Sequence, residues 1–242
     1  MKSKIIISIV FVLFLFSCKK NDPQKPTANS SNPAGLLYTS RHTFDTTYPI
    51  FPSDSISYTD EAVCEFFDYT SGVTVGILVD TVYLNGVGLD IIPNDSGVYD
   101  AYYGIFDDLN SNCSWDVVGS GTIPSFAYNH STPFPNFTGA LPAGFAKSNG
   151  VTFNIQFTNA DSVVIELWGD SLSANAIISK SFLPSSSFTF NPNEVATLYT
   201  SSALSFRNIF TIKAYNHTIQ TLSGKNFYFM KTLEYTGGIW VY

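Results

Sequence analysis

The residues best suited to chemistry lie between positions 99 and 116, where aromatic and acidic side chains gather around one polar turn. Sugar rings dock on aromatic faces, while carboxylates and amides hydrogen-bond sugar hydroxyls, usually in a concave cleft. We therefore take six residues of this stretch as candidate glycan contacts: Tyr102, Tyr103, Asp107, Asp108, Asn110 and Asn112. The simpler alternative is that some of these side chains pack in a core and the others lie scattered on strand surfaces.

The same turn has the oxygen spacing of a cation site. Four residues fall at positions 1, 3, 5 and 9 of a calcium loop: Asp108, Asn110, Asn112 and Asp116. However, Cys113 stands where such a loop needs glycine, and Gly119 stands where it needs a bidentate glutamate. An EF-hand is therefore excluded, which leaves either a looser cation site or an ordinary polar turn.

Signatures of catalysis are missing from the sequence. The three histidines, His42, His130 and His217, have no His or Cys partner at metal-ligand spacing, and no HExxH motif is present. The Gly-Ser-Gly sequence at residues 119–121 is a glycine-rich turn and not the GxSxG elbow of hydrolases. Neither a phosphate-binding loop nor a dinucleotide-binding fingerprint occurs, so we predict no cofactor and no catalytic metal.

Paired carboxylates are the one catalytic arrangement that the sequence leaves open. Glycoside hydrolysis needs two acids roughly 5 Å or 6.5–9.5 Å apart, and they can come from distant strands. Seven acids qualify in this loose sense: Glu65, Asp68, Asp107, Asp108, Asp116, Glu166 and Glu194. Solvated loop acids are the simpler interpretation, so an enzyme acting on surface polysaccharide is the alternative to a non-catalytic protein.

The composition favours strands and argues against nucleic-acid binding. The chain has 21 Phe and 14 Tyr among 242 residues, and only 13% of its residues are charged. Aromatic residues fit strands, whereas exposed helix faces favour Glu, Lys and Ala. The net charge of −7 is the opposite of the basic footprint that phosphate backbones require.

Short apolar runs separated by turn residues mark the elements that would position these side chains. The Asn-Gly pair at 85–86 predicts a hairpin, because both residues tolerate positive φ. One strand carries Trp115 towards a core, and residues 151–157 alternate strictly, as half-buried strands do. The sequence NPNE at 191–194 provides an N-cap, a first-turn proline and a capping glutamate, which predict one helical turn over 194–198.

The segment 129–144 holds three prolines, which cannot lie in a central strand because each removes a hydrogen-bond donor from the ladder. We take this segment as a linker between two domains. Regular short strands with turns about every 8 to 12 residues are typical of sandwich folds. We therefore predict an all-β protein with two immunoglobulin-like β-sandwich domains in tandem, over residues 36–128 and 145–242.

The first eighteen residues indicate where the protein works. Lys2 and Lys4 precede an apolar run from Ile5 to Phe16, which is shorter than the roughly 20 residues of a membrane-spanning helix. This pattern is that of a secretory signal peptide over residues 1–17. The sequence Leu15-Phe16-Ser17-Cys18 resembles the lipobox of bacterial lipoproteins, with Phe16 in place of the usual small or β-branched residue.

This resemblance covers only residues 1–18, and it implies cleavage before Cys18 with acylation of its thiol and new amino group. Residues 18–35 would then be a flexible lipidated tether, because they are rich in Pro, Asn and Ser and have no apolar period. Lys19 occupies the position where Asp retains the best-studied lipoproteins in the inner membrane. The resemblance therefore implies lipid anchoring in the outer membrane, at either its periplasmic or its surface face.

Cys64 and Cys113 remain once Cys18 is assigned to the lipid. In a compartment that permits disulfides, the two can form a bond. The alternative is a pair of buried thiols, which behave as small hydrophobic residues. The sequence leaves both arrangements open, because it does not show whether their Cα atoms are close enough.

Taken together, these features predict an outer-membrane-anchored lipoprotein that acts as a non-catalytic binding or structural module of the cell envelope. Its expected partners are the membrane, through the lipid, and a glycan or a neighbouring envelope protein. No nucleic acid is expected among them.

Overall fold

The structure, a computed structural model, describes residues 33–45, 56–68, 74–93, 100–109, 111–169, 177–201 and 208–242. The expected signal peptide, the lipidation site Cys18, most of the tether and the candidate contact Asn110 lie outside these residues. Apart from one short helix, the regular elements of the described chain are all strands, which confirms the all-β class. Within it, no helix is both long and apolar enough to cross a membrane.

The elements form one large sheet and two small ones. In chain order they are β1 (Gly35–Asp45), β2 (Ile56–Asp68), β3 (Val75–Gly76), β4 (Thr81–Leu84), β5 (Val87–Gly88), β6 (Asp90–Pro93), β7 (Asp100–Phe106), β8 (Cys113–Val118), β9 (Phe126–His130), β10 (Asn136–Ala140), β11 (Gly144–Phe145), β12 (Val151–Thr158), β13 (Ser162–Trp168), β14 (Ile177–Phe182), β15 (Phe188–Phe190), α2 (Pro192–Val195), β16 (Asn208–Leu222) and β17 (Lys225–Val241). The large sheet has the order β14-β13-β16-β17-β1-β2-β7-β6, with β11 paired to β17 and β3 to β2. The small sheets are β5-β4-β8-β9 and β10-β12-β15.

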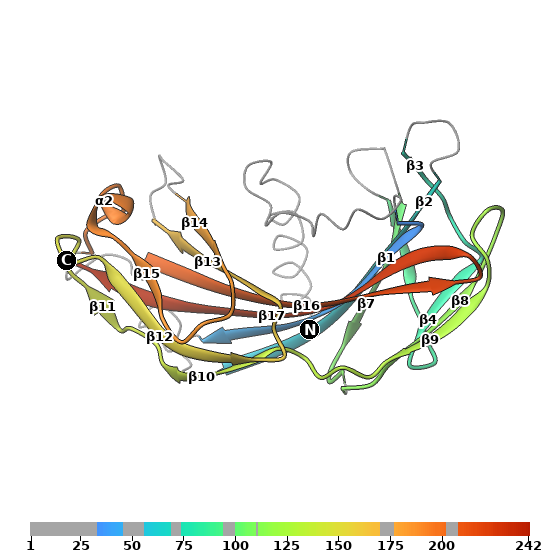
Figure 1. The fold of residues 1–242 in the computed structure, drawn as a ribbon, viewed down its shortest axis with the longest axis horizontal. Helices are drawn as coiled ribbons and strands as arrows, with labels where there is room; N and C mark the ends of the chain where they lie inside the picture. The colour runs from blue at the N-terminus through green and yellow to red at the C-terminus, as the bar shows by residue number, and fades with distance from the viewer. Residues whose placement is uncertain are drawn as a thin grey trace, which may run out of the picture. The chain divides into compact units, whose positions relative to one another are not determined.

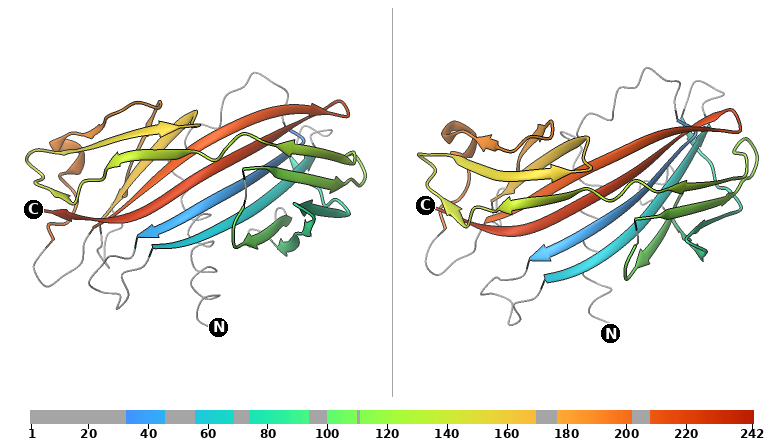
Figure 2. Two further views of the ribbon diagram at one scale, coloured as in Figure 1. Left: turned by 90° about the horizontal axis from the view of Figure 1, so that it is seen from below. Right: turned by 60° about the horizontal axis from the view of Figure 1, so that its bottom comes forward.

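The β16–β17 hairpin runs through the large sheet, and its strands are 15 and 17 residues long (Figure 1). Its turn, Ser223-Gly224, has positive φ at both residues, 49° and 79°, which matches the twist of the flanking strands. On its other side β17 pairs in parallel with β1, and β1 pairs antiparallel with β2 (Figure 2). The first described strand is therefore held against the last one.

Each small sheet covers a hydrophobic core on the large sheet. The first core joins Trp115 of β8 to Phe227 and Phe229 of β17. The second core joins Phe153 of β12 to Leu233 and other residues of β17. Alternate residues of a strand share a face, so these odd-numbered residues of β17 point the same way. One strand thus contributes to both cores.

The expected division into tandem domains over 36–128 and 145–242 is not confirmed. Residues 31–242 form one compact unit, and strands from both segments pair in the same large sheet. The expected linker at 129–144 contains β10, together with the end of β9 and the first residue of β11, and its prolines lie between strands. As expected, the prolines lie outside the strands. The large sheet nevertheless joins the segments before and after them, because β1 pairs with β17. Sequence periodicity does not reveal such a pairing.

Several local predictions are confirmed. Asn85 and Gly86 both have positive φ and connect β4 to β5. Trp115 is 1% exposed, and β12 alternates buried and exposed residues. The helix begins at Pro192, two residues before the expected start, and the Asn191 backbone N–H donates to the Glu194 carboxylate at 2.7 Å. The range expected for the tether, 18–35, overlaps the folded part, because residue 34 is buried and β1 begins one residue later.

The two cysteines of the folded part are buried thiols and form no disulfide. Cys64 lies on β2 of the large sheet, whereas Cys113 lies on β8 of the opposing small sheet. The Cys113 thiol donates to the Thr39 hydroxyl at 3.8 Å. Of the two arrangements that the sequence leaves open, the structure contains the second, in which both side chains pack in the first core.

Candidate functional site

The structure places the two tyrosines of the predicted glycan site on different faces of the large sheet. Tyr102 is buried in the first core, and its hydroxyl donates to the backbone oxygen of Val79. Tyr103 lies on the opposite face of β7, where burial and the nearby Glu61 carboxylate raise its pKa. Because neighbouring residues of a strand face opposite ways, these two rings cannot contact the same sugar.

The polar turn that follows β7 is anchored by an ion pair. Arg41 donates to both carboxylate oxygens of Asp60, at 3.1 Å and 3.0 Å, and to Asp108 at 3.2 Å. Asp60, which is buried, also accepts the backbone N–H of Leu109 at 2.6 Å. Two other candidates of this turn are exposed: Asp107 and Asn112. Asp108 thus contributes to holding the turn on the sheet.

A different site lies where the edge pairing of β17 is interrupted. β1 pairs with β17 up to the Phe44–Thr236 position, and β11 resumes the pairing at Trp240. In the described part of the chain, residues 237–239 have no strand on this side. The Trp240 N–H donates to Ala143 on the β11 side at 3.0 Å, so by alternation the N–H and C=O of Gly238 also point into the gap.

A hollow of about 230 Å³ occupies this interruption. It is lined by Asp45, Leu141, Pro142, Ala143, Phe210, Tyr235, Gly237, Gly238 and Trp240. The two glycines leave its floor without side chains. At Gly237 a Cβ atom would lie 2.7 Å from the Phe210 ring, so glycine is what allows this ring to lie against the backbone.

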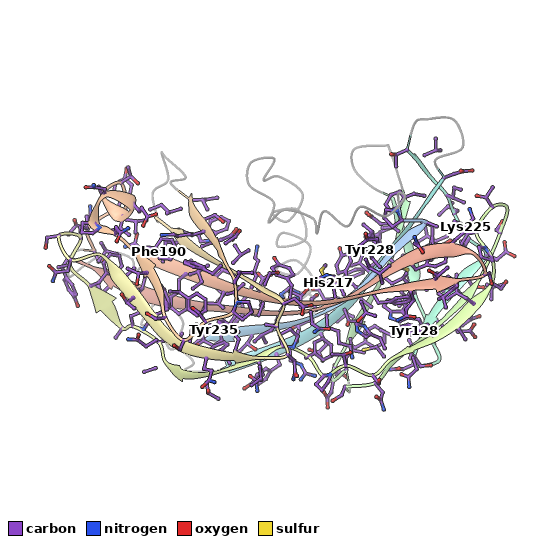
Figure 3. The ribbon with its side chains drawn as sticks, in the orientation of Figure 1. Tyr128, Phe190, His217, Lys225, Tyr228 and Tyr235 are labelled. Atoms are coloured by element: carbon purple, nitrogen blue, oxygen red, sulfur yellow. The ribbon has the colours of Figure 1, made fainter. Side chains whose placement is uncertain are left out.

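Aromatic packing holds Tyr235 in place, and Tyr235 in turn orients the Asp45 carboxylate of the hollow. Tyr235 lies over the large sheet (labelled in Figure 3). It stacks on Phe210, with centroids 5.9 Å apart and 25° between the planes, and meets Phe137 edge-on at 5.5 Å. Its hydroxyl donates to the carboxylate of Asp45 at 2.9 Å. By strand alternation Trp240 lies on the other face of β17 from Tyr235. The Tyr235 ring, the Asp45 carboxylate and the backbone groups of Gly238 thus meet at the end of β1, whereas Trp240 lines the hollow from the other face.

This arrangement is suited to holding a small polar molecule that has an apolar face. Asp45 is the only charged side chain among the described residues that line the hollow. Glycoside hydrolysis needs two carboxylates, so these lining residues do not supply that chemistry. No group of three His, Cys, Asp or Glu residues that could hold a metal ion occurs in the described part of the chain.

Sequence reasoning missed this hollow, although one signal for it was present. Gly237-Gly238 interrupts an otherwise aromatic and β-branched stretch near the C-terminus. Glycine inside a strand pattern marks a bulge or a close approach by another group. Asp45 and Tyr235 are 190 residues apart, and nothing in the sequence indicates that the ends of β1 and β17 meet.

A second polar cluster lies on the opposite face of the large sheet. The His42 ring lies between two carboxylates, with Nε2 3.7 Å from Glu61 and Nδ1 3.8 Å from Glu234. The Ser40 hydroxyl is 3.0 Å from Nε2. Burial raises the pKa of Glu61, and the charge of Glu234 raises it further, whereas His42 lowers it. Neither glutamate is among the acids nominated from the sequence.

Three of the nominated acids, in contrast, have basic partners, one of them being Asp108 with Arg41 at 3.2 Å. Glu166 lies 3.3 Å from Lys213, and Glu194 lies 2.9 Å from Lys180. Asp68 accepts a hydrogen bond from Thr122 at 3.3 Å. These contacts give the acids structural roles at strand ends and along the sheet.

No protein-family model matches the chain, and neither a curated protein nor a solved structure matches it.

Proposed function

We propose that this chain is an outer-membrane lipoprotein whose folded part is a non-catalytic module that binds carbohydrate at the cell envelope. The anchor is supported by the lipobox-like sequence that ends at Cys18. The binding role is carried by one observation, the hollow lined by Asp45, Tyr235 and Trp240 in the gap between β1 and β11.

The hollow has the three kinds of group that sugar recognition uses. Aromatic rings offer apolar faces to the C–H groups of a sugar ring. The Asp45 carboxylate, oriented by the Tyr235 hydroxyl at 2.9 Å, accepts hydrogen bonds from sugar hydroxyls. The backbone groups of Gly238 add a donor and an acceptor at the floor.

The second candidate is an enzyme that acts on surface polysaccharide, and the His42 cluster favours it. Glu61 and Glu234 flank one imidazole, and the raised pKa of Glu61 suits a general acid. In this structure, however, both carboxylates face the imidazole of His42. We therefore rank this candidate below the binding module.

A glycan array tests the proposal with the full-length lipoprotein in detergent. Ala143 is exposed and lines the hollow, so Ala143→Trp fills the hollow while leaving both cores intact. Ala127 is exposed on β9, outside the hollow, and Ala127→Trp is the matched control.

We expect the wild-type protein and Ala127→Trp to retain the same sugars, and Ala143→Trp to lose them by at least about tenfold. Circular dichroism establishes that both variants are folded. Equal retention by Ala143→Trp and Ala127→Trp would place binding elsewhere. An array on which no sugar is retained would contradict the proposal, and turnover of a polysaccharide that Glu61→Gln abolishes would favour the enzyme.

A further inference from the structure

We propose that His217 and Met230, on the face of the large sheet that points away from the two cores, bind a soft monovalent metal ion, Cu(I). This site is independent of the proposed function, because it uses none of the residues that line the hollow. It is carried by the register of the β16–β17 hairpin and by the way in which Asp161 holds the His217 ring.

The hairpin places the two side chains beside each other. His217 of β16 (labelled in Figure 3) stands directly opposite Met230 of β17 in the antiparallel register. Residues so paired share a face of the sheet, and their Cβ atoms are roughly 4.5–5.5 Å apart. Phe229 packs in the first core, so by alternation Met230 and its partner lie on the other face, where both side chains are half-buried. A single ion is therefore within reach of both.

Asp161 fixes the orientation of the His217 ring. Its Oδ2 atom lies 3.0 Å from Nδ1 of the ring and also accepts the backbone N–H of His217 at 2.8 Å. When the ring proton on Nδ1 is directed at this oxygen, Nε2 keeps a lone pair. Metal-bound histidines typically have this arrangement, in which the second ring nitrogen donates to a carboxylate.

The lone pair of Nε2 is turned towards the methionine side of β16. Asp161 immediately precedes β13, and β16 lies between β13 and β17 in the large sheet. The two nitrogens of an imidazole ring point in different directions. Because Nδ1 faces the β13 side, Nε2 faces away from it, and Met230 lies across β16 from Asp161.

This pair of donors selects the metal. A thioether is a soft ligand that favours Cu(I), and imidazole also suits copper. Zinc sites instead use three or four ligands drawn from imidazole, thiolate and carboxylate groups. The described residues contain no group of three His, Cys, Asp or Glu for such a site, whereas Cu(I) tolerates low coordination numbers.

The scarcity of methionine in this chain makes the site easy to observe. Met1 and Met230 are its only two methionines, so a chain labelled with ¹³C at the methionine methyl groups gives at most two signals. Met230→Leu identifies the signal of Met230. The full-length lipoprotein in detergent is titrated with Cu(I), which ascorbate keeps reduced under nitrogen. We expect the Met230 signal to move and to saturate at one ion per chain, and an equal titration with Zn(II) to leave it in place.

Competition with a chromophoric Cu(I) chelator measures the affinity of each variant. We expect Met230→Leu and His217→Gln each to weaken binding at least about tenfold. Met230→Leu conserves volume, and circular dichroism establishes that both variants are folded. Ile219→Leu, at the next pair along the same face, is the matched control and should bind like the wild-type protein.

The buried thiols Cys64 and Cys113 are the other soft ligands in the described part of the chain. Uptake of Cu(I) that is unchanged in Met230→Leu or in His217→Gln would place the metal elsewhere and overturn the proposed pair. A Met230 signal that stays in place with Cu(I), or that moves equally with Zn(II), would also overturn it.

Discussion

The two cores on the large sheet differ in how they treat charge. Beside the first core lie three buried titratable side chains, Asp60, His130 and Lys231, each no more than 2% exposed. The second core is closed by phenylalanine rings such as Phe188 and Phe190, and the hollow with Asp45 opens next to it. At the first core, buried charged side chains hold loops on the sheet, whereas next to the second core the Asp45 carboxylate lines a hollow.

Lys231 shows this most clearly. It lies on β17 between the residues of the two cores, and its ammonium donates to the backbone oxygens of Ser111, His130 and Thr132, the last two at 2.7 Å and 2.6 Å. The Phe134 ring lies 5.1 Å away. A buried cation with three acceptors and an aromatic face is fully satisfied within the protein.

The largest expected effect is therefore that of Lys231→Met. It leaves three carbonyls without their donor, and at roughly 1–3 kcal/mol for each unsatisfied group we expect a loss of about 4 kcal/mol in the free energy of unfolding. Urea unfolding followed by circular dichroism measures this loss. Lys225→Met, at the turn of the same hairpin, is the control and should change stability by less than about 0.5 kcal/mol. Equal losses in the two variants would contradict the role of the buried ammonium.

The next effect is that of Arg41→Met, which removes the partner of buried Asp60. An uncompensated buried carboxylate typically costs 3–5 kcal/mol, and because the Arg41 side chain is partly exposed we expect about 3 kcal/mol. The control is Asp108→Asn, since that side chain is 79% exposed and its pair with Arg41 should contribute less than about 1 kcal/mol. Chemical denaturation compares both variants with the wild-type protein. If Arg41→Met abolished sugar retention without loss of stability, the turn would be a binding site.

The smallest effect concerns pH and His130. Burial lowers the pKa of His130 to about 4, with a further contribution from Lys231, against about 6.5 in an unfolded chain. Because the folded pKa is the lower one, the folded state resists protonation. The contribution of His130 to the free energy of unfolding is therefore fully present above a pH of about 6.5, and it is lost as the pH falls towards about 4.

Between pH 7 and pH 4.5, we expect the free energy of unfolding of the wild-type protein to fall by about 2 kcal/mol because of His130. His130→Gln should show a correspondingly flatter dependence in urea unfolding at the two pH values. An identical pH dependence in the two proteins would show that folding does not lower the pKa of His130.

The parts of this fold that could be predicted from the sequence are those governed by neighbouring residues. Asn85-Gly86 forms its hairpin because two consecutive residues tolerate positive φ, and Trp115 is buried because its strand alternates. The β16–β17 hairpin has no comparable local signal, because β16 carries many polar residues and its turn is Ser-Gly rather than Asn-Gly. The hollow depends on where β1 and β11 stop along β17, and that register is not encoded locally.

The parallel contact between β1 and β17 also bears on the order of assembly. Asp45 and Tyr235, which meet at the end of this contact, are separated by 190 positions, and links between such remote positions form slowly because a long loop must close first. Until the C-terminal strand has been synthesised, the β17-facing edge of β1 stays unfinished. A nascent chain therefore exposes this edge of β1 until β17 is available to pair with it.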